Sequence, residues 1–131
     1  MPDKSLKKGI LKQNGVHLQD HEYATVKLFL EQGYDIELIP QSQIKYYRAP
    51  DMMMEGVAWE IKAPEGASSK TIKHTIQNAL QQSNNVIIDL CRCRLPQAQA
   101  LKDIEREFRL SKRLRRLKVV LKDKKILDYS K

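Results

Sequence analysis

A continuous apolar run in the second half of the chain constrains its fold more than any other feature. Residues 85–90 contain Val86, Ile87 and Ile88 in direct succession. A strand with one face in water alternates apolar and polar residues, whereas an unbroken run is typical of a strand buried on both faces. Helical patterns precede and follow this run. We therefore predict a central strand in a sheet that is flanked by helices.

Apolar spacing and punctuating residues predict three helices. They span residues 20–32, about 68–82 and about 96–111. Gly33 is the stop signal of the first helix, Ser68 or Ser69 caps the second, and Pro96 starts the third.

Short β-type segments separated by turn residues predict the strands. They lie at residues 35–39, 45–48 with 51–54, 57–63, 85–90, 117–121 and 125–129. Pro50 must sit at a strand start or edge, and Glu55-Gly56 is the predicted turn of a hairpin. The element order is α-β-β-β-α-β-α-β-β. This order predicts an α/β (α+β) fold with a mixed central sheet flanked by helices.

The length of 131 residues corresponds to one domain with a short extension. We predict a polar N-terminal extension over residues 1–18 and a single domain over residues 19–131 that ends in a basic helix and a β-hairpin. No apolar run approaches the roughly 20 residues of a membrane helix, and the start lacks the apolar core of a signal peptide. Cys91 and Cys93 cannot build a disulfide framework, so we expect reduced structural thiols in a cytoplasmic protein.

The positive charge is concentrated at one end of the chain. Residues 102–131 contain 12 basic and 5 acidic side chains, which is most of the net charge of +8. A basic end of this kind indicates a polyanionic partner, with nucleic acid first and a membrane surface second. A solvated helix face is the alternative reading of the same charges.

The segment 57–63, Val-Ala-Trp-Glu-Ile-Lys-Ala, carries the most informative side chains. Alternation along a strand places Trp59 and Ile61 on one face and Glu60 and Lys62 on the other. If a helix covers the charged face, both charges are partly buried and need a partner or a function. On an edge strand they would be a solvated ion pair.

Asp51 adds a second carboxylate to this pair. Folding residues 52–54 back on residues 57–59 brings Asp51 near Glu60 or Lys62. Two carboxylates beside a lysine suit a hard divalent cation, and we predict Asp51, Glu60 and Ile61 as its ligands. Mg²⁺ is the expected ion, with Mn²⁺ and Zn²⁺ as alternatives. It would activate a water and polarise a phosphate, while Lys62 orients the water or stabilises charge.

The order Pro50-Asp51, eight residues, then Glu60-Ile61-Lys62 resembles the PD-(D/E)XK nuclease signature. The surrounding elements agree, since a helix carrying Glu22 comes first, followed by three short strands, a helix and the apolar strand. The resemblance implies that Glu22 joins Asp51, Glu60 and Lys62 in the catalytic site.

A closer resemblance covers residues about 20–129. Segments 21–24, 33–36, 59–62, 82–90 and 124–129 are similar to the C-terminal tRNase domain of contact-dependent growth-inhibition proteins. This resemblance implies a metal-dependent ribonuclease that cuts tRNA in the cytoplasm, with Gln82 touching the substrate. If the domain is a toxin, a cognate immunity protein should cover its site. The chain is then either a stand-alone protein or the C-terminal fragment of a larger delivered one.

Further candidate nucleic-acid contacts come from three places in the chain. The helix start at Ser69, Lys70 and Thr71 offers backbone N–H groups to a phosphate. Arg92 and Arg94 follow the central strand, where ligands bind in open α/β sheets. Arg106, Arg109 and Arg113 fall on one stripe if the last helix continues that far.

Two other functions are consistent with the same residues. One is a metal-dependent DNA endonuclease of the PD-(D/E)XK type. The other is a nucleic-acid-binding module in which Glu60 and Lys62 are structural. The tRNA substrate is favoured by the family resemblance alone.

Overall fold

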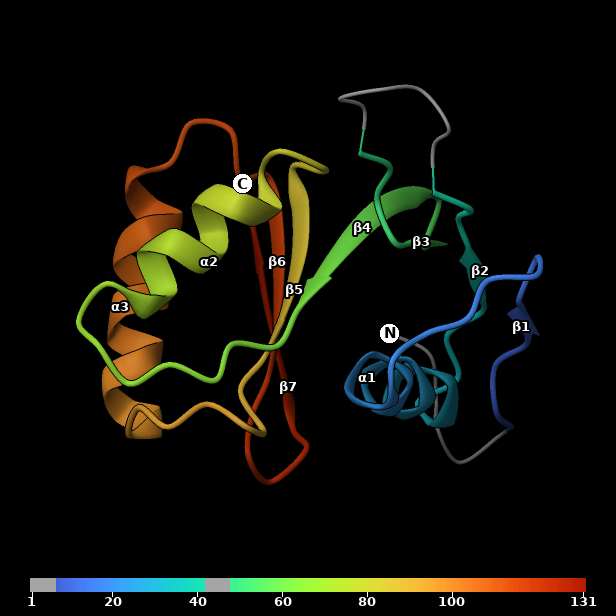
Figure 1. The fold of residues 1–131 in the computed structure, drawn as a ribbon, viewed down its shortest axis with the longest axis horizontal. Helices are drawn as coiled ribbons and strands as arrows, with labels where there is room; N and C mark the ends of the chain where they lie inside the picture. Colours follow the sequence, from blue (N-terminus) through green and yellow to red (C-terminus); the bar gives the residue numbers. More distant parts are fainter. Residues whose placement is uncertain (1–6, 42–47) are drawn as a thin grey trace. The chain divides into compact units, whose positions relative to one another are not determined.

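The computed structural model describes residues 7–41 and 48–131. The chain forms two compact units, Met1–Trp59 and Glu60–Lys131, and Figure 1 shows its elements. In chain order they are β1 (Leu11–Lys12), α1 (Asp20–Glu31), β2 (Ile36–Leu38), β3 (Met52–Met54), β4 (Val57–Lys62), α2 (Thr71–Ala79), β5 (Asn85–Asp89), α3 (Gln97–Leu110), β6 (Arg116–Val120) and β7 (Ile126–Ser130).

Strand β1 was not predicted. It pairs in parallel with β2, Leu11 opposite Ile36, and so lies in the predicted N-terminal extension. Gly9 makes the approach possible, because a Cβ there would lie 1.7 Å from the carbonyl oxygen of Tyr34. The amide of Ile10 also donates to the Asp35 carboxylate at 2.8 Å. Contacts with residues that are distant in the sequence stabilise this two-residue strand, and no local sequence pattern predicts it.

The end of α1 is confirmed at Gly33, which has a φ of 96°. The amide of Gly33 donates to Leu30 and that of Tyr34 donates to Phe29, at 3.0 and 3.1 Å. The rings of Phe29 and Tyr34 meet edge to face with their centroids 5.5 Å apart. These are the two hydrogen bonds and the apolar contact of a Schellman motif, which needs a residue that tolerates positive φ.

The hairpin turn between β3 and β4 is also where the sequence placed it. Glu55 and Gly56 have φ values of 56° and 79°, and Met54 pairs directly with Val57. Two residues of positive φ form the turn whose twist matches an antiparallel pair. Of the strand expected before Pro50, residues 45–47 lie outside the described residues.

Strand β4 takes part in two ladders. Its first three residues pair antiparallel with β3, and Glu60, Ile61 and Lys62 pair in parallel with β5. The hydrogen-bonded strand order is β1-β2-β3-β4-β5-β6-β7, with β5–β6 parallel and β6–β7 antiparallel. The predicted mixed sheet with flanking helices is confirmed, with β1 as an added first element.

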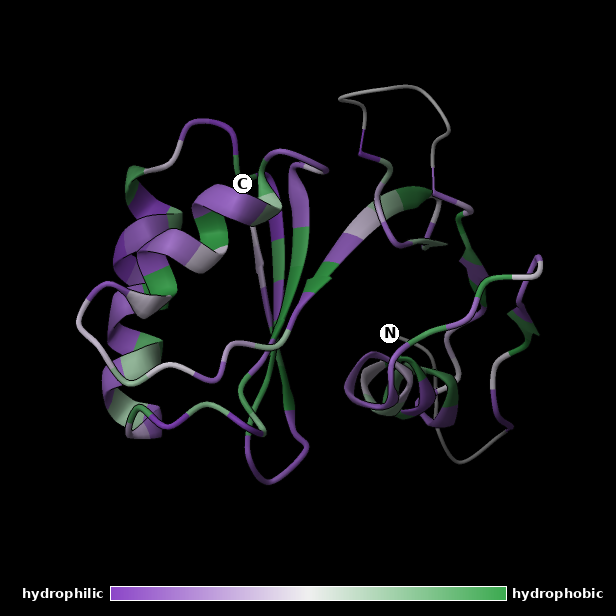
Figure 2. Ribbon diagram, viewed as in Figure 1, coloured by the Kyte–Doolittle hydropathy of each residue, from purple (hydrophilic) through white to green (hydrophobic). Residues whose placement is uncertain are grey.

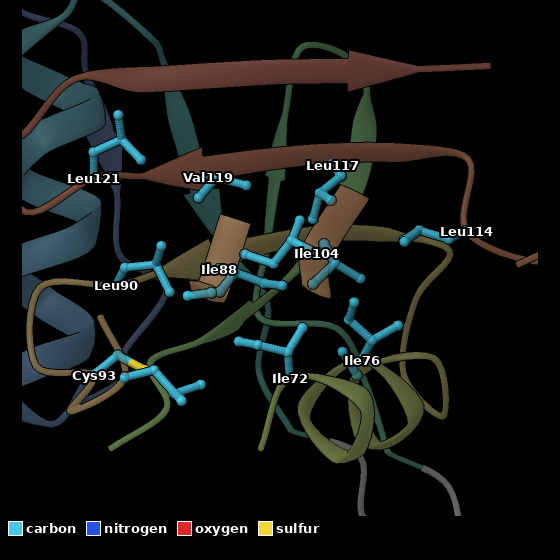
Figure 3. Packing of buried hydrophobic residues seen from close by; sticks show 14 residues of the cluster. Ile72, Ile76, Ile88, Leu90, Cys93, Ile104, Leu114, Leu117, Val119 and Leu121 are labelled. Atoms are coloured by element: carbon cyan, nitrogen blue, oxygen red, sulfur yellow. The ribbon is translucent and has the colours of Figure 1, made fainter. Parts of the chain in front are cut away.

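The core of the second unit lies between its strands and the helices α2 and α3, which cover one face in Figure 1. Ile72 and Ile76 of α2 and Ile104 of α3 gather with Ile88 and Leu117 in Figure 3. Figure 2 shows the hydrophobic residues of β5 and β6 in mid-strand, while α2 and α3 are largely hydrophilic outside. The central strand is thus buried as its apolar run predicted, with Val86, Ile87 and Ile88 all at 0% exposure.

Both predicted boundaries of the second helix are wrong, whereas the predicted end of the third helix is confirmed. Helix α2 begins at Thr71 with Lys70 as its N-cap, and no side chain caps it. Beyond Ala79 the chain tightens into i→i+3 bonds, with the amide of Gln82 donating to Ala79 at 2.9 Å. Helix α3 ends at Leu110, and the chain then turns to bury Leu114 before β6.

Candidate active site

Glu60 and Lys62 stand on the face of β4 that the register assigns to the helix side. Glu60 pairs with Val86 and Lys62 with Ile88, and both partners belong to the core under α2 and α3. Residues paired across a ladder share a face of the sheet. Ile61 lies on the opposite face with Ile87, so the predicted alternation of this strand is correct.

The two side chains form an ion pair of unequal burial. The Lys62 Nζ lies 3.4 Å from the Glu60 Oε2, and their side chains are 28% and 5% exposed. A solvated ion pair is therefore excluded for Glu60. Because a buried carboxylate is costly without a compensating charge, Lys62 stabilises its ionised form. The arrangement gives a buried acid beside a cation that solvent reaches, which suits a site for an incoming anion.

Asp51 and Glu22 belong to the first unit. The amide of Asp51 donates to the Trp59 carbonyl at 3.0 Å, and Trp59 precedes Glu60 in the chain. Glu22 is the third residue of α1, where its Oε1 accepts from the Gln19 amide at 3.0 Å. This bond completes a capping box, which is a structural role for Glu22. The assignment of Asp51 and Glu22 to the catalytic site stays a prediction.

The predicted metal ligands fit Mg²⁺ by their chemistry. Glu60 and Asp51 supply carboxylate oxygens, and Ile61 can supply only its main-chain carbonyl. Mg²⁺ prefers oxygen donors and keeps several waters, so it needs few protein ligands. Within residues 7–41 and 48–131, no group of three or more His, Cys, Asp or Glu side chains is gathered as a ready metal cage.

Glu60 lies toward the amino ends of the parallel strands, where basic residues collect. Asn85 and Arg116 pair one position before Val86 and Leu117, and Arg116 donates to the Asn85 Oδ1 at 3.3 Å. The last turn of α3 and the approach to β6 lie at this end. We call its cations the basic end, which comprises Arg109, Lys112, Arg113, Arg115 and Arg116.

Gln82 lies at the same end, in the turn that leads from α2 to β5. Its Oε1 is buried and has no hydrogen-bond partner among the described residues. Buried acceptors are usually satisfied, and exceptions deserve a functional explanation. The predicted contact of Gln82 with substrate would supply such a partner.

Comparison with known proteins places the chain in a family. The model of the contact-dependent growth inhibition CdiA C-terminal domain matches residues 48–126. The chain belongs to the CdiA C-terminal domain family.

A solved structure of a CdiA-CT/CdiI toxin and immunity complex from Burkholderia pseudomallei is similar to this member of the family. The match has a TM-score of 0.73 with 19% sequence identity, and covers 94% of this chain and 100% of that chain. At this identity the likeness shows a shared fold. A search of curated proteins finds no match. No helix in the described part of the chain is both long and apolar enough to span a bilayer.

Two predicted nucleic-acid contacts of this CdiA C-terminal domain also donate hydrogen bonds to the protein itself. The Nε of Arg92 donates to the Ala63 carbonyl at 2.9 Å, and the Nε of Arg94 donates to the Glu65 carbonyl at 2.8 Å. The Arg92 guanidinium also pairs with the Glu65 carboxylate at 2.9 Å. Both side chains reach across from the end of β5 to the segment after β4.

The helix start at Ser69, Lys70 and Thr71 is partly occupied by its own hydrogen bonds. The Lys70 amide donates to the Ser68 hydroxyl, and the Thr71 amide donates to the Ser68 carbonyl, both at 3.2 Å. The Ser68 amide donates in turn to the Thr71 hydroxyl at 3.1 Å. The first two bonds use the Lys70 and Thr71 N–H groups that were predicted to bind a phosphate.

The predicted stripe of Arg106, Arg109 and Arg113 does not exist as one helical face, because α3 ends before Arg113. Arg106 pairs with the buried Asp103 at 3.5 Å and with Glu107 at 3.4 Å. Arg113 donates to the Leu80 carbonyl at 2.6 Å, at the C-cap of α2. Arg109 stays in the basic end. The stripe left out Arg115 and Arg116, which could have been found from their position at the start of β6.

The two cysteines are free, and Cys93 is buried. Burial raises the pKa of the Cys91 thiol, and Asp89 raises it further, against the opposing effect of Lys124. The Nζ of Lys124 lies 3.2 Å from the Cys91 Sγ. A thiol with a raised pKa is a poor nucleophile at neutral pH, which agrees with structural thiols.

A hollow of about 420 Å³ lies in the first unit. Ile10, Lys12, Glu37 and Met53 are among its lining residues, and none of the predicted site residues lines it.

Proposed function

We propose that this CdiA C-terminal domain is a metal-dependent ribonuclease that cuts tRNA. The observation that carries the proposal is the buried Glu60 carboxylate paired with Lys62, with Glu60 at the amino ends of the parallel strands, where the basic end also lies. A purely structural ion pair gains little from being buried. A site that joins an acid, a cation and a basic approach is instead suited to a phosphodiester.

The proposed roles follow from the chemistry of each side chain. Glu60, Ile61 and Asp51 would hold a divalent ion, Mg²⁺ first of all, with Glu22 as a further catalytic residue. When bound, such an ion polarises a phosphate and lowers the pKa of a water. Lys62 would orient the attacking water or stabilise negative charge as it develops on the phosphate.

The basic end would hold the RNA backbone. Contacts to phosphates supply affinity without reading sequence, and they weaken as salt rises. Gln82, with its buried acceptor at this end, would contact the substrate beside the cleaved bond.

The central experiment incubates the purified domain with total tRNA and with duplex DNA, each with Mg²⁺ or with EDTA. We expect cleavage of tRNA with Mg²⁺ and none with EDTA. Cleavage of DNA in preference would make the domain the alternative PD-(D/E)XK endonuclease. Binding without cleavage under any metal would make it a binding module.

We also propose that the domain acts in the cytoplasm of a recipient cell as part of a larger delivered protein, and that a cognate immunity protein blocks it. The family assignment supports delivery, and the similar solved structure is of a toxin with its immunity protein. Expression inside bacteria should stop growth as intact tRNA disappears. Growth arrest that persists in a Glu60→Gln variant would contradict this proposal.

A further inference from the structure

The segment that joins β4 to α2 is held by side chains from a different loop. Residues 63–66 follow Lys62 directly, and three of their carbonyls accept hydrogen bonds from residues 92–94. Arg92 binds Ala63 and Arg94 binds Glu65, at 2.9 and 2.8 Å. Between them, the Sγ of Cys93 lies 3.6 Å from the Gly66 carbonyl oxygen. The parallel pairing of β4 and β5 is thus continued by side chains beyond the ends of both strands.

The alternation of residues 91–95 explains why these bonds form. Cys93 and Leu95 are buried at 3% and 5% exposure, whereas Arg92 and Arg94 are exposed. The buried residues anchor the loop in the core. The two arginines are therefore aimed along the surface toward residues 63–65. Hydrogen bonds from a charged donor are stronger than neutral ones, which suits this task.

On the basis of the proposed function, we propose that Arg92 and Arg94 are positioning residues that act through residues 63–65 on Lys62. Lys62 pairs with Ile88 in the β4–β5 ladder, and the two arginines fix the segment that directly follows it. Its Nζ must stay within reach of both Glu60 and a substrate phosphate. A shift of about 1 Å in such a group can cost about a hundredfold in rate.

The ion pair of Arg92 with Glu65 argues against a phosphate contact for Arg92. Each bond to the chain comes from Nε, and the Arg92 guanidinium also neutralises the Glu65 carboxylate. A guanidinium that binds phosphate bidentately needs its donors and its charge uncompensated.

The use of Nε provides a matched pair of variants. Glutamine places its amide nitrogen where arginine has Nε, so R92Q/R94Q keeps both hydrogen bonds to the carbonyls and removes both charges. R92M/R94M keeps apolar bulk and removes bonds and charges alike. Lys102→Met, an exposed cation on α3, controls for the loss of surface charge.

Cleavage kinetics, RNA affinity and hydrogen exchange of the amides in residues 62–68 test the proposal. R92M/R94M should lower kcat by about 10- to 100-fold, with KM and RNA affinity within about twofold, and should speed exchange. R92Q/R94Q should restore kcat to within about threefold and exchange to the wild-type rate. Single R92M and R94M variants, checked by thermal melting, serve if the double variant fails to fold.

Two results would overturn the proposal. One is a loss of RNA affinity of about tenfold in both double variants, because charge would then matter and not the hydrogen bonds. The other is unchanged exchange in R92M/R94M. If the wild-type domain cuts no nucleic acid, the proposed function fails, and exchange still decides whether the arginines hold this segment.

Discussion

The two ends of the parallel strands β4, β5 and β6 both carry cations but use them differently. At the carboxyl ends, Arg92, Arg94 and Lys122 donate to main-chain carbonyls of neighbouring loops. At the amino ends, Arg113 and Arg116 also bind the protein itself, whereas no hydrogen bond or ion pair within the described residues involves the side chains of Arg109, Lys112 or Arg115. Positive charge alone therefore does not identify a binding surface, because the protein itself takes up the donors of several of these cations.

Removal of the buried acid should have the largest effect. Glu60→Gln keeps the shape of the side chain, so we expect folding and RNA binding to persist while cleavage falls by about 10²–10⁴-fold. Asp123→Asn, an exposed carboxylate near the carboxyl ends, is the matched control and should change the rate little. Asp51→Asn should resemble Glu60→Gln if both hold the metal. Rates under single-turnover conditions decide this, and equal rates for E60Q and wild type would remove Glu60 from the mechanism.

The basic end should dominate RNA affinity. R109Q/K112Q/R115Q removes three cations and should weaken tRNA binding about 10- to 100-fold, with the salt slope reduced by about two to three. K122Q/K124Q/K125Q removes three cations at the opposite end and should leave affinity within about threefold. Binding is measured in the E60Q background across a salt series. Similar losses in both triple variants would erase the distinction between the two ends.

Arg113 should separate structure from binding within the basic end. Its bond to the Leu80 carbonyl stabilises the C-terminal end of α2, where a cation also favours the helix dipole. We expect Arg113→Met to lower the free energy of unfolding by about 1–2 kcal/mol. Arg115→Met should leave it unchanged and weaken RNA binding instead. Urea denaturation measures the first effect, and a destabilised R115M would argue against this division.

Gln82→Leu should improve stability while it harms cleavage. The Oε1 of Gln82 is buried without a partner in the described part of the chain, and its removal relieves a desolvation cost of about 1 kcal/mol. Loss of the substrate contact should lower kcat/KM at the same time. Thermal melting and cleavage are compared on one preparation. A variant that loses stability would show that the amide is structural.

The smallest expected effect is a change in the stability of the domain at alkaline pH, which comes from Tyr129 in β7. Burial, together with the hydrogen bond to Glu105, raises the pKa of Tyr129 from 10.0 to about 12. Its stabilising contribution is thus complete below about pH 10 and lost as the pH rises to about 12. Tyr129→Phe should flatten this part of the stability curve. Urea midpoints at about pH 9 and about pH 11 measure the difference, and parallel curves for both proteins would contradict it.

The sequence predicted those parts of the fold that local physics determines. Gly33 ends α1 because its φ is positive, and Glu55-Gly56 turns the hairpin for the same reason. The apolar run at Val86–Ile88 is buried because nothing in it suits water. Strand β1 escaped prediction, since only pairing with β2 and the close contact at Gly9 hold it.

The candidate site likewise contains features that the local sequence predicts and features that only the folded chain determines. That Glu60 and Lys62 share one face could be inferred from alternation along one strand, but the burial of Glu60 could not, because it depends on what covers that face. The roles of Arg92, Arg94 and Arg113 could not, because each depends on which carbonyl lies within reach in the folded chain. Whether Asp51, Glu22 and Ile61 take part in catalysis stays a prediction from spacing and family resemblance.

The pairing of β4 with both β3 and β5 has a consequence for the order in which the domain folds. Its hairpin with β3 closes over two residues, and hairpins form in microseconds. The pairing of Glu60 with Val86 must wait for a whole helical crossover to close, and distant contacts of this kind form later. The burial of Glu60 beside β5 would therefore follow the formation of the hairpin. The environment that buries Glu60 thus depends on the later of the two pairings of β4.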